Sequence, residues 1–189
     1  MWAALNMLRG PATVRKIKTH WKLMRRLWKA FEHVADHALS VGARVFVEWP
    51  RGCAYWRAPT VYKFLKRRRF EFADFDGCMY GLTAVHGRDA GTPINKPWRV
   101  ACSPNSSLPQ MLNKRCDHSH AHTRCAGRNT LMTQGYTDTI CDIVHRSICH
   151  DVAKAGIKGE STQHQIACVA ADPVARCGDG SGDASVAAA

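Results

Sequence analysis

The sequence lacks a long apolar run, a secretory leader and, in its first part, acidic side chains. No stretch approaches the ~20 consecutive apolar residues that a membrane-spanning helix needs, so no span is expected. Nine cysteines are an odd number, and no signal peptide opens the 189-residue chain, which argues against a secreted disulfide scaffold. The sequence therefore predicts an intracellular protein with reduced thiols, located in the nucleus or the cytoplasm.

Positive charge is concentrated in the first seventy residues. The chain carries 27 Lys and Arg against 15 Asp and Glu, a formal net charge of +12. Residues 1–70 hold 16 basic and 3 acidic side chains, whereas residues 71–189 hold 11 and 12. This excess favours a polyanionic partner such as nucleic acid. An organelle transit segment is an alternative explanation for the basic start.

Apolar residues recur at alternating spacings of three and four from residue 14 to residue 41, which predicts one long helix. The stripe consists of Ile17, Trp21, Met24, Trp28, Phe31, Ala35 and Ala38. Basic residues largely outside it are Lys16, Lys18, Lys22, Arg25, Arg26 and Lys29. We interpret this basic face either as a nucleic-acid contact or as an ordinary solvated surface, with a membrane-surface helix as a weaker alternative. The apolar stripe itself is an alternative docking surface for a partner or a second copy.

Further elements follow in an alternating order. Residues 44–48 and 70–75 are typical of strands, residues 59–68 of a helix, and residues 78–85 and 98–102 of shorter strands. Helix, strand, helix and strand in succession predict an α/β fold with a partial Rossmann-like parallel sheet and crossover helices. Thr137 is expected to cap a last helix.

The expected organisation has four parts. A lead-in covers residues 1–13, the partial α/β domain residues 14–112, and a small Cys/His loop module with the last helix residues 113–157. Residues 158–189, rich in Gly, Ser, Ala and Asp, are expected to be a disordered tail.

Five potential metal ligands lie within ten residues. Zinc takes four N or S donors in a tetrahedron, so two His and two Cys would complete a structural site. The preferred set is Cys116, His120, His122 and Cys125, with His118 as a substitute. The alternative is a His-rich surface loop whose cysteines only pack, because the order of ligands is not that of a zinc finger.

Glu48 ends a predicted buried strand, where α/β sheets present functional residues. A carboxylate there needs a partner or a chemical role, and Arg51, Arg57 and Arg99 are candidate partners. Arg51 and Arg57 also lie among aromatic residues, which suits phosphate pairing beside stacked bases. Arg67, Arg68 and Arg69 end the second helix and add to the candidate nucleic-acid surface.

The order of these motifs resembles that of the DNA cytosine methyltransferases. In that family a strand ends in Glu-Asn-Val, whose Glu grips the target cytosine, and Val47-Glu48-Trp49-Pro50 is similar to it. The family's Tyr-Gly and its later Gln-x-Arg-x-Arg strand resemble Met79-Tyr80-Gly81 and the segment 95–100, where Arg99 matches. The resemblance covers roughly residues 14–102 and implies catalytic roles for Glu48 and Arg99.

A longer resemblance is to a group of uncharacterised, highly duplicated proteins of mobile-element-rich protist genomes. It covers about residues 1–152 and implies no established activity. The shared pattern consists of Glu48-Trp49-Pro50-x-Gly52-Cys53-x-Tyr55-Trp56, Phe75-Asp76-Gly77-Cys78-x-Tyr80-Gly81, Lys96-Pro97-Trp98-Arg99, Cys116 with His120, His122, Cys125 and Gly127, and Tyr136-Thr137.

Two parts of a methyltransferase are missing from the sequence. Such an enzyme needs a Cys nucleophile before the long helix and a Gly-rich turn for the methyl donor. No Pro-Cys precedes Val14, and no Gly-x-Gly follows an early strand. The start at Met1 is therefore expected to be a truncation or a gene-model artefact.

The sequence thus predicts a nucleic-acid-binding, zinc-stabilised fragment of a methyltransferase-like domain that is not catalytic alone. One alternative is an active DNA methyltransferase-like enzyme whose upstream half is missing and would bring S-adenosylmethionine. The other is a protein-interaction module.

Overall fold

A computed structural model describes residues 8, 10–125, 129–130, 133 and 135–156. The chain divides into two units, residues 1–156 and 157–189, and all described residues belong to the first. The expected disordered tail of residues 158–189 lies outside the described residues.

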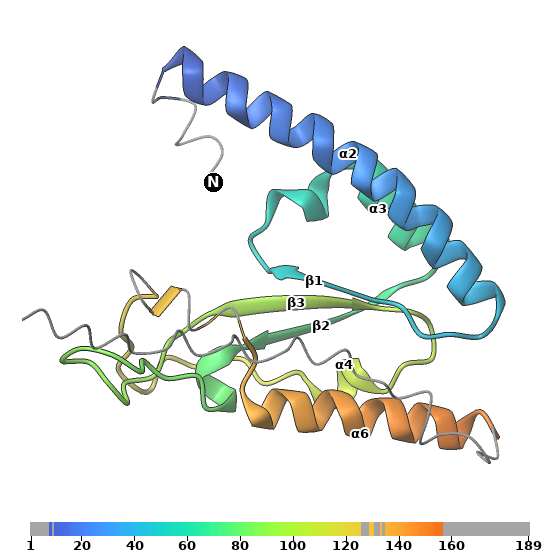
Figure 1. The fold of residues 1–189 in the computed structure, drawn as a ribbon. Coiled ribbons are helices and arrows are strands. Elements are labelled where there is room, and N and C mark those ends of the chain that lie inside the picture. Colours follow the sequence, from blue (N-terminus) through green and yellow to red (C-terminus); the bar gives the residue numbers. More distant parts are fainter. Residues whose placement is uncertain (1–7, 9, 126–128, 131–132, 134, 157–189) are drawn as a thin grey trace, which may run out of the picture. The chain divides into compact units, whose positions relative to one another are not determined.

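The longest element is the helix α2 (Pro11–Ser40) (Figure 1). Pro11 suits the first turn because an N–H there has no helical partner. Gly42, with φ of +79°, takes the left-handed conformation that commonly follows a helix end. The predicted helix is confirmed, starting three residues earlier and ending one residue sooner. Its buried side chains share one face and are Ile17, Met24, Trp28 and Ala35.

Three strands form the sheet: β1 (Phe46–Pro50), β2 (Glu71–Asp76) and β3 (Pro97–Cys102). Their order is β1-β3-β2, and β3 is antiparallel to both neighbours. The predicted parallel, Rossmann-like sheet is therefore wrong, although the chain has a mixed α/β fold. β1 and β2 are oriented in the same direction, and the helix α3 (Pro59–Arg67) lies between them in the sequence. In the sheet, however, β3 lies between them.

The buried side chains of β3 explain why this strand lies in the middle of the sheet. Four of its six side chains are buried, on both faces of the sheet, namely Trp98, Val100, Ala101 and Cys102. The outer strands instead carry Glu48 and Glu71, and charged side chains are typical of sheet edges. A strand with buried apolar side chains on both faces removes most apolar area from water when it has a neighbour on each side.

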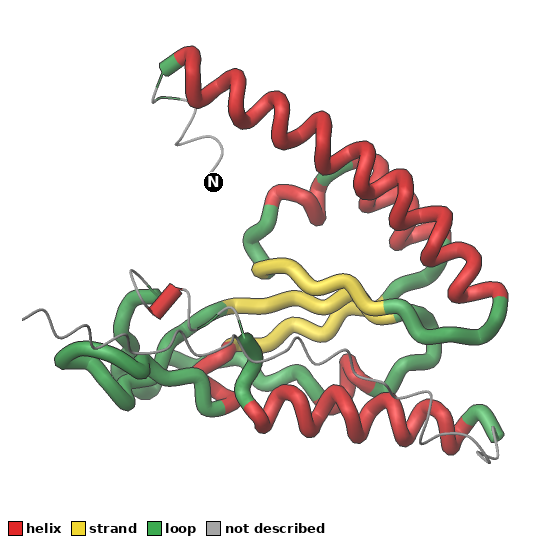
Figure 2. The backbone as a smooth tube through the Cα atoms, in the orientation of Figure 1, coloured by secondary structure: helices red, strands yellow, loops and turns green. Residues whose placement is uncertain are grey.

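Helices cover both faces of the sheet (Figures 1 and 2). One face packs on α2 and α3 through a core that includes Trp28, Val47, Phe64 and Ala101. The other face packs on α4 (Leu108–Met111) and α6 (Asp138–Lys154). Its core includes Phe75, Val100, Leu108 and Ile140. Thr137 caps α6 by accepting the N–H of Ile140, as the sequence predicts.

Two short 3₁₀-helices complete the description: η1 (Ala54–Arg57) and η2 (Gly77–Tyr80). The prediction of strand structure over residues 78–85 is largely wrong, because η2 begins that segment and only Thr83 makes an isolated bridge there. None of the helices in the described residues is both long enough and apolar enough to cross a bilayer.

Candidate metal centre

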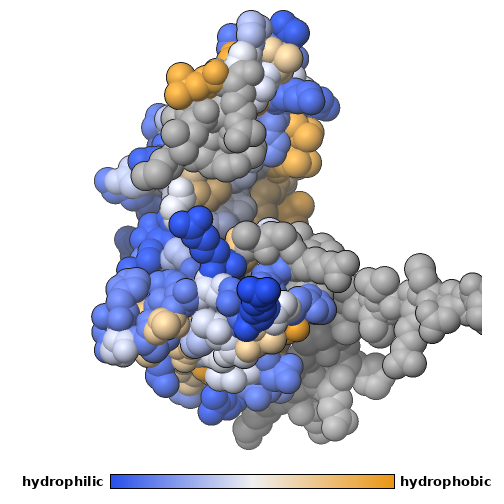
Figure 3. Space-filling model, turned by 90° about the vertical axis from the view of Figure 1, so that its left-hand side faces the viewer, coloured by the Kyte–Doolittle hydropathy of each residue, from blue (hydrophilic) through white to orange (hydrophobic). Residues whose placement is uncertain are grey.

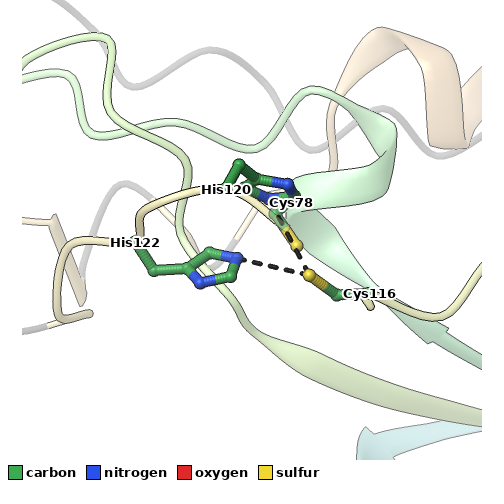
Figure 4. A group of neighbouring side chains, drawn as sticks. All are labelled: Cys78, Cys116, His120 and His122. Carbon is green, nitrogen blue, oxygen red and sulfur yellow. Dashed lines mark hydrogen bonds between the residues drawn. The ribbon is translucent and has the colours of Figure 1, made fainter. Parts of the chain in front are cut away.

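Two cysteines and two histidines lie together beyond the end of β2 (Figure 4). Cys78 belongs to η2, which follows β2 directly. Cys116, His120 and His122 belong to the loop after α4. The four ligand atoms all lie within 4.8 Å of one another. This group could therefore hold one metal ion.

The distances fit a tetrahedral ion. The Sγ atom of Cys116 lies 3.8 Å from Nε2 of His120 and 3.4 Å from Nε2 of His122. In a zinc site with Zn–S near 2.3 Å and Zn–N near 2.0–2.1 Å, the S···N separation is about 3.6 Å. The three side chains are thus already spaced as ligands of a common ion.

Asp76, at the end of β2, holds the ligand loop against the sheet. Its carboxylate is almost fully buried and accepts the backbone N–H of Cys116 at 2.9 Å. Its backbone N–H donates to the carbonyl of Lys114 at 3.1 Å. Arg51 and Arg115 bind the same carboxylate at 3.1 and 3.3 Å, which compensates its buried charge. One buried side chain therefore fixes the position of Cys116 relative to η2.

The next residues explain the turn that presents Cys78. A Cβ on Gly77 would lie 2.6 Å from Leu82 and 2.9 Å from Trp98, so only glycine fits there. The hydroxyl of Tyr80 accepts the N–H of Lys114 at 2.9 Å. The turn and the ligand loop are thus joined at both Asp76 and Tyr80.

His118 contributes to the centre through its backbone. Its N–H donates to Sγ of Cys116 at 3.3 Å, and its φ of +62° turns the chain so that this contact forms. The N–H of Ser119 donates to the Asp117 carboxylate at 3.0 Å and supports the same turn. An N–H directed at sulfur stabilises a thiolate. The ring of His118 is exposed, 5.7 Å from that of His122.

The local environment changes two pKa values. Burial, followed by the nearby Cys116, raises the pKa of the Cys78 thiol to about 12. A bound cation acts in the opposite direction, because a coordinating thiol is deprotonated. Burial lowers the pKa of His122, and the neighbouring imidazoles of His120 and His118 lower it further. A lower pKa favours the neutral form of the His122 imidazole, which is the form that binds metals.

Three of the four predicted ligands belong to this group, and Cys78 takes the place assigned to Cys125. Cys125 is exposed, with Sγ 3.1 Å from Oγ1 of Thr133. Sequence reasoning missed Cys78 because it lies 38 residues before Cys116 in the chain. The available signal was the run Asp76-Gly77-Cys78 after a strand, a tight turn that ends in a metal ligand.

The predicted catalytic residues Glu48 and Arg99 are not brought together. Glu48 is directly opposite Val100, and successive strand residues alternate between faces, so Arg99 is on the other face of the sheet. The Arg99 guanidinium binds the Asp74 carboxylate at 2.6 and 2.7 Å. Oε2 of Glu48 instead accepts a hydrogen bond from the Tyr136 hydroxyl at 2.7 Å. Its Oε1 is buried and has no hydrogen-bond partner among the described residues.

The predicted nucleic-acid-binding residues differ in how they are paired. Lys16, Lys18, Lys22, Arg25 and Arg26 are all exposed on α2, and none forms an ion pair within the described part of the chain.

Three predicted arginines have carboxylate partners. Arg51 binds Asp76, while Arg67 and Arg68 lie 3.7 and 2.7 Å from the Asp36 carboxylate. This pair of contacts holds the pKa of Asp36 below its usual range, with the Arg68 hydrogen bond as the main cause. Arg57 and Arg69 are exposed. Among the ten predicted residues, those without an ion pair in the described part of the chain are thus five on α2 and two elsewhere, Arg57 and Arg69.

Comparisons with known proteins give no relative. No protein-family model, no curated protein and no solved structure matches the chain.

Proposed function

We propose that this chain is a zinc-stabilised nucleic-acid-binding module that is not catalytic alone. The observation that carries the proposal is the basic part of α2. Seven basic residues without an intervening acid occupy its first two thirds: Arg15, Lys16, Lys18, Lys22, Arg25, Arg26 and Lys29. Its acidic residues, Glu32 and Asp36, come only afterwards.

The geometry of these cations suits a polyanion. A helix rises about 1.5 Å per residue, so residues 15–29 span roughly 21 Å along the axis. Exposed cations over that length can each neutralise a phosphate and release its counterions, which supplies sequence-independent affinity. Arg67 and Arg68 share the Asp36 carboxylate, which offsets part of their charge, so these two residues contribute less.

Zinc is the metal that the donor set favours. Two thiolates and two neutral imidazoles suit zinc, and four protein ligands leave no open position for a catalytic water. The ligands come from the turn after β2 and from the loop after α4, so an ion would link two segments of the fold. A structural role follows, because binding energy at such a site becomes folding energy.

Derivation from a methyltransferase-like domain, with no activity in this chain by itself, rests on the motif resemblance alone, because the antiparallel β3 between β1 and β2 departs from the parallel sheet that this resemblance implies. The alternative of an active enzyme has less support, because strand alternation directs Glu48 and Arg99 to opposite faces. It also still requires a methyl-donor site, and so S-adenosylmethionine, from an upstream segment.

Salt-dependent binding tests the proposal. Fluorescence anisotropy with a short labelled DNA duplex, and with an RNA of the same sequence, is measured between roughly 50 and 200 mM salt. The triple variant Lys18→Gln, Lys22→Gln and Arg25→Gln removes three exposed α2 charges. Its affinity should fall at least about tenfold, and the log–log salt slope should become shallower by about 2.7.

A matched variant controls for net charge. Lys63→Gln, Lys66→Gln and Arg88→Gln remove the same number of exposed charges outside α2, two from α3 and one from the loop at residue 88. This control should bind like the wild type, with at most a small change in slope. Equal loss in both variants, or no binding by the wild type at low salt, contradicts the proposal.

A further inference from the structure

The two sulfur atoms of the candidate metal centre point toward each other (Figure 4). Cys78 and Cys116 are 38 residues apart in the sequence, yet their Sγ atoms lie within 4.8 Å of each other. Among the described cysteines, only these two belong to the group, and both are free thiols. A disulfide places its two sulfur atoms about 2.05 Å apart. A displacement of less than about 3 Å therefore joins them.

The segment that carries Cys116 permits this displacement. The ligand loop, residues 113–122, contains neither helix nor strand. Asp76 forms hydrogen bonds with the backbone of Lys114 and of Cys116, and Tyr80 accepts the N–H of Lys114. A change of χ1 rotamer moves a cysteine Sγ by roughly 3 Å and leaves such backbone contacts in place. The sulfur atoms can thus meet while the loop stays beside η2.

Solvent reaches the centre. Cys78 and Cys116 are half-buried, and the residues that follow Cys116 are exposed, namely Asp117, His118 and Ser119. Figure 3 shows a mostly hydrophilic surface in the lower part of the molecule, where the loops beyond the sheet lie. A small polar oxidant such as hydrogen peroxide can therefore approach the sulfur atoms from water.

Both cysteines are in their reactive form when they ligate zinc. A coordinating thiol is deprotonated, and the thiolate is the form of cysteine that acts as a nucleophile. Two sulfur ligands of one tetrahedral ion, each near 2.3 Å from it, lie about 3.8 Å apart. The centre thus holds two thiolates close together and ready to be joined.

We propose that the metal centre is a redox switch, in which a peroxide oxidises Cys78 and Cys116 to a disulfide and zinc is released. This inference rests on the proposed zinc centre and adds its regulation. It does not depend on whether nucleic acid binds to α2.

The reaction with hydrogen peroxide balances in two steps. One thiolate attacks a peroxide oxygen, the O–O bond breaks, and a sulfenic acid and hydroxide form. The second thiolate attacks the sulfur of the sulfenic acid, the S–S bond forms, and a second hydroxide leaves. Two electrons pass from sulfur to the peroxide, and two protons from solvent convert the two hydroxides to water. Zinc leaves because only the imidazoles of His120 and His122 remain as ligands.

The disulfide keeps the fold linked after zinc has left. It joins η2 to the ligand loop, which are the same two segments that a shared ion joins. A disulfide across such a long loop stabilises a protein mainly by restricting its unfolded chain. Oxidation therefore exchanges a metal link for a covalent link, and it frees His120 and His122.

Peroxide titration of the full chain, loaded with zinc and freed of reductant, tests the switch. Bound zinc is counted before peroxide is added. Released zinc is then measured with a chelating dye, lost thiols with a thiol reagent, and disulfides by mass spectrometry of peptides. We expect one zinc released for every two thiols lost, with Cys78 joined to Cys116. A dithiol reductant and fresh zinc should restore the loaded protein.

Two variants and a stability measurement complete the test. Cys125→Ser keeps both sulfur ligands, so this matched control should respond like the wild type. The oxidised, zinc-free wild type should melt at a higher temperature than the reduced, zinc-free wild type. Cys78→Ser, which lacks one partner, should gain no such rise on oxidation.

The outcomes separate the switch from the zinc centre. Zinc that stays bound in excess peroxide, or zinc release without a disulfide between Cys78 and Cys116, overturns the switch and leaves the zinc centre standing. A chain that binds no zinc before peroxide is added overturns the zinc centre and this inference with it.

Discussion

Replacing Cys78 by serine removes one thiolate from the candidate metal centre and leaves Cys125 in place. Because the Cys78 ligand atom lies within 4.8 Å of the other three, we expect zinc affinity to collapse. Zinc at one hundred times its dissociation constant stabilises a folded protein by about 2.7 kcal/mol. For a chain of this size 1 kcal/mol corresponds to roughly 2–4 °C, so zinc should raise the wild-type melting temperature by about 5–11 °C.

The assay is thermal unfolding with and without zinc, in a reducing buffer, for three proteins. The wild type and Cys125→Ser should show the full rise in melting temperature. Cys78→Ser should show little or none, although its melting temperature without zinc should resemble that of the wild type. A full rise in melting temperature with zinc in Cys78→Ser, or loss of the rise only in Cys125→Ser, would show that Cys78 is not a ligand.

Two further predictions concern the segment around β2. Gly77→Ala should lower stability by about 1–3 kcal/mol in urea unfolding, because the new methyl group overlaps packed side chains. Gly52→Ala, where nothing lies within 4 Å of a new Cβ, should change it far less, and equal effects would contradict the packing argument. The Arg99 hydrogen bond holds the pKa of Asp74 below its usual range. Asp74 thus stabilises the fold at neutral pH, and this contribution should fade below about pH 4. Asp74→Asn should flatten this part of the stability profile, and an unchanged profile would rule out the ion pair as its cause.

The sequence predicts the helices α2, α3 and α6 and the three strands of the sheet because their signals are local, although the strand expected over residues 78–85 does not form. The apolar spacing along residues 14–41 and the β-branched run before Pro50 need no distant partner to be recognised. Thr137 likewise identifies the start of α6 by its own side chain. Each of these features is decided within a few residues of the chain.

Strand order and the full ligand set are not local. The insertion of β3 between β1 and β2 depends on which strand is apolar on both faces, and this competition cannot be read from the alternation of elements. The same limit applies to Cys78, which reaches the loop of Cys116 only after η2 turns and Asp76 binds the loop. The clustering of His and Cys residues between positions 116 and 125 favoured Cys125, because it lies nearer to Cys116 in the sequence than Cys78 does.

X-ray absorption at the zinc edge on zinc-loaded Cys125→Ser protein tests the four-ligand metal centre most directly. We expect two sulfur ligands near 2.3 Å and two nitrogen ligands near 2.0–2.1 Å, as in an intact tetrahedral site. These ligands are Cys78, Cys116, His120 and His122. A spectrum with one sulfur ligand, and a nitrogen or oxygen in place of the second, would contradict it.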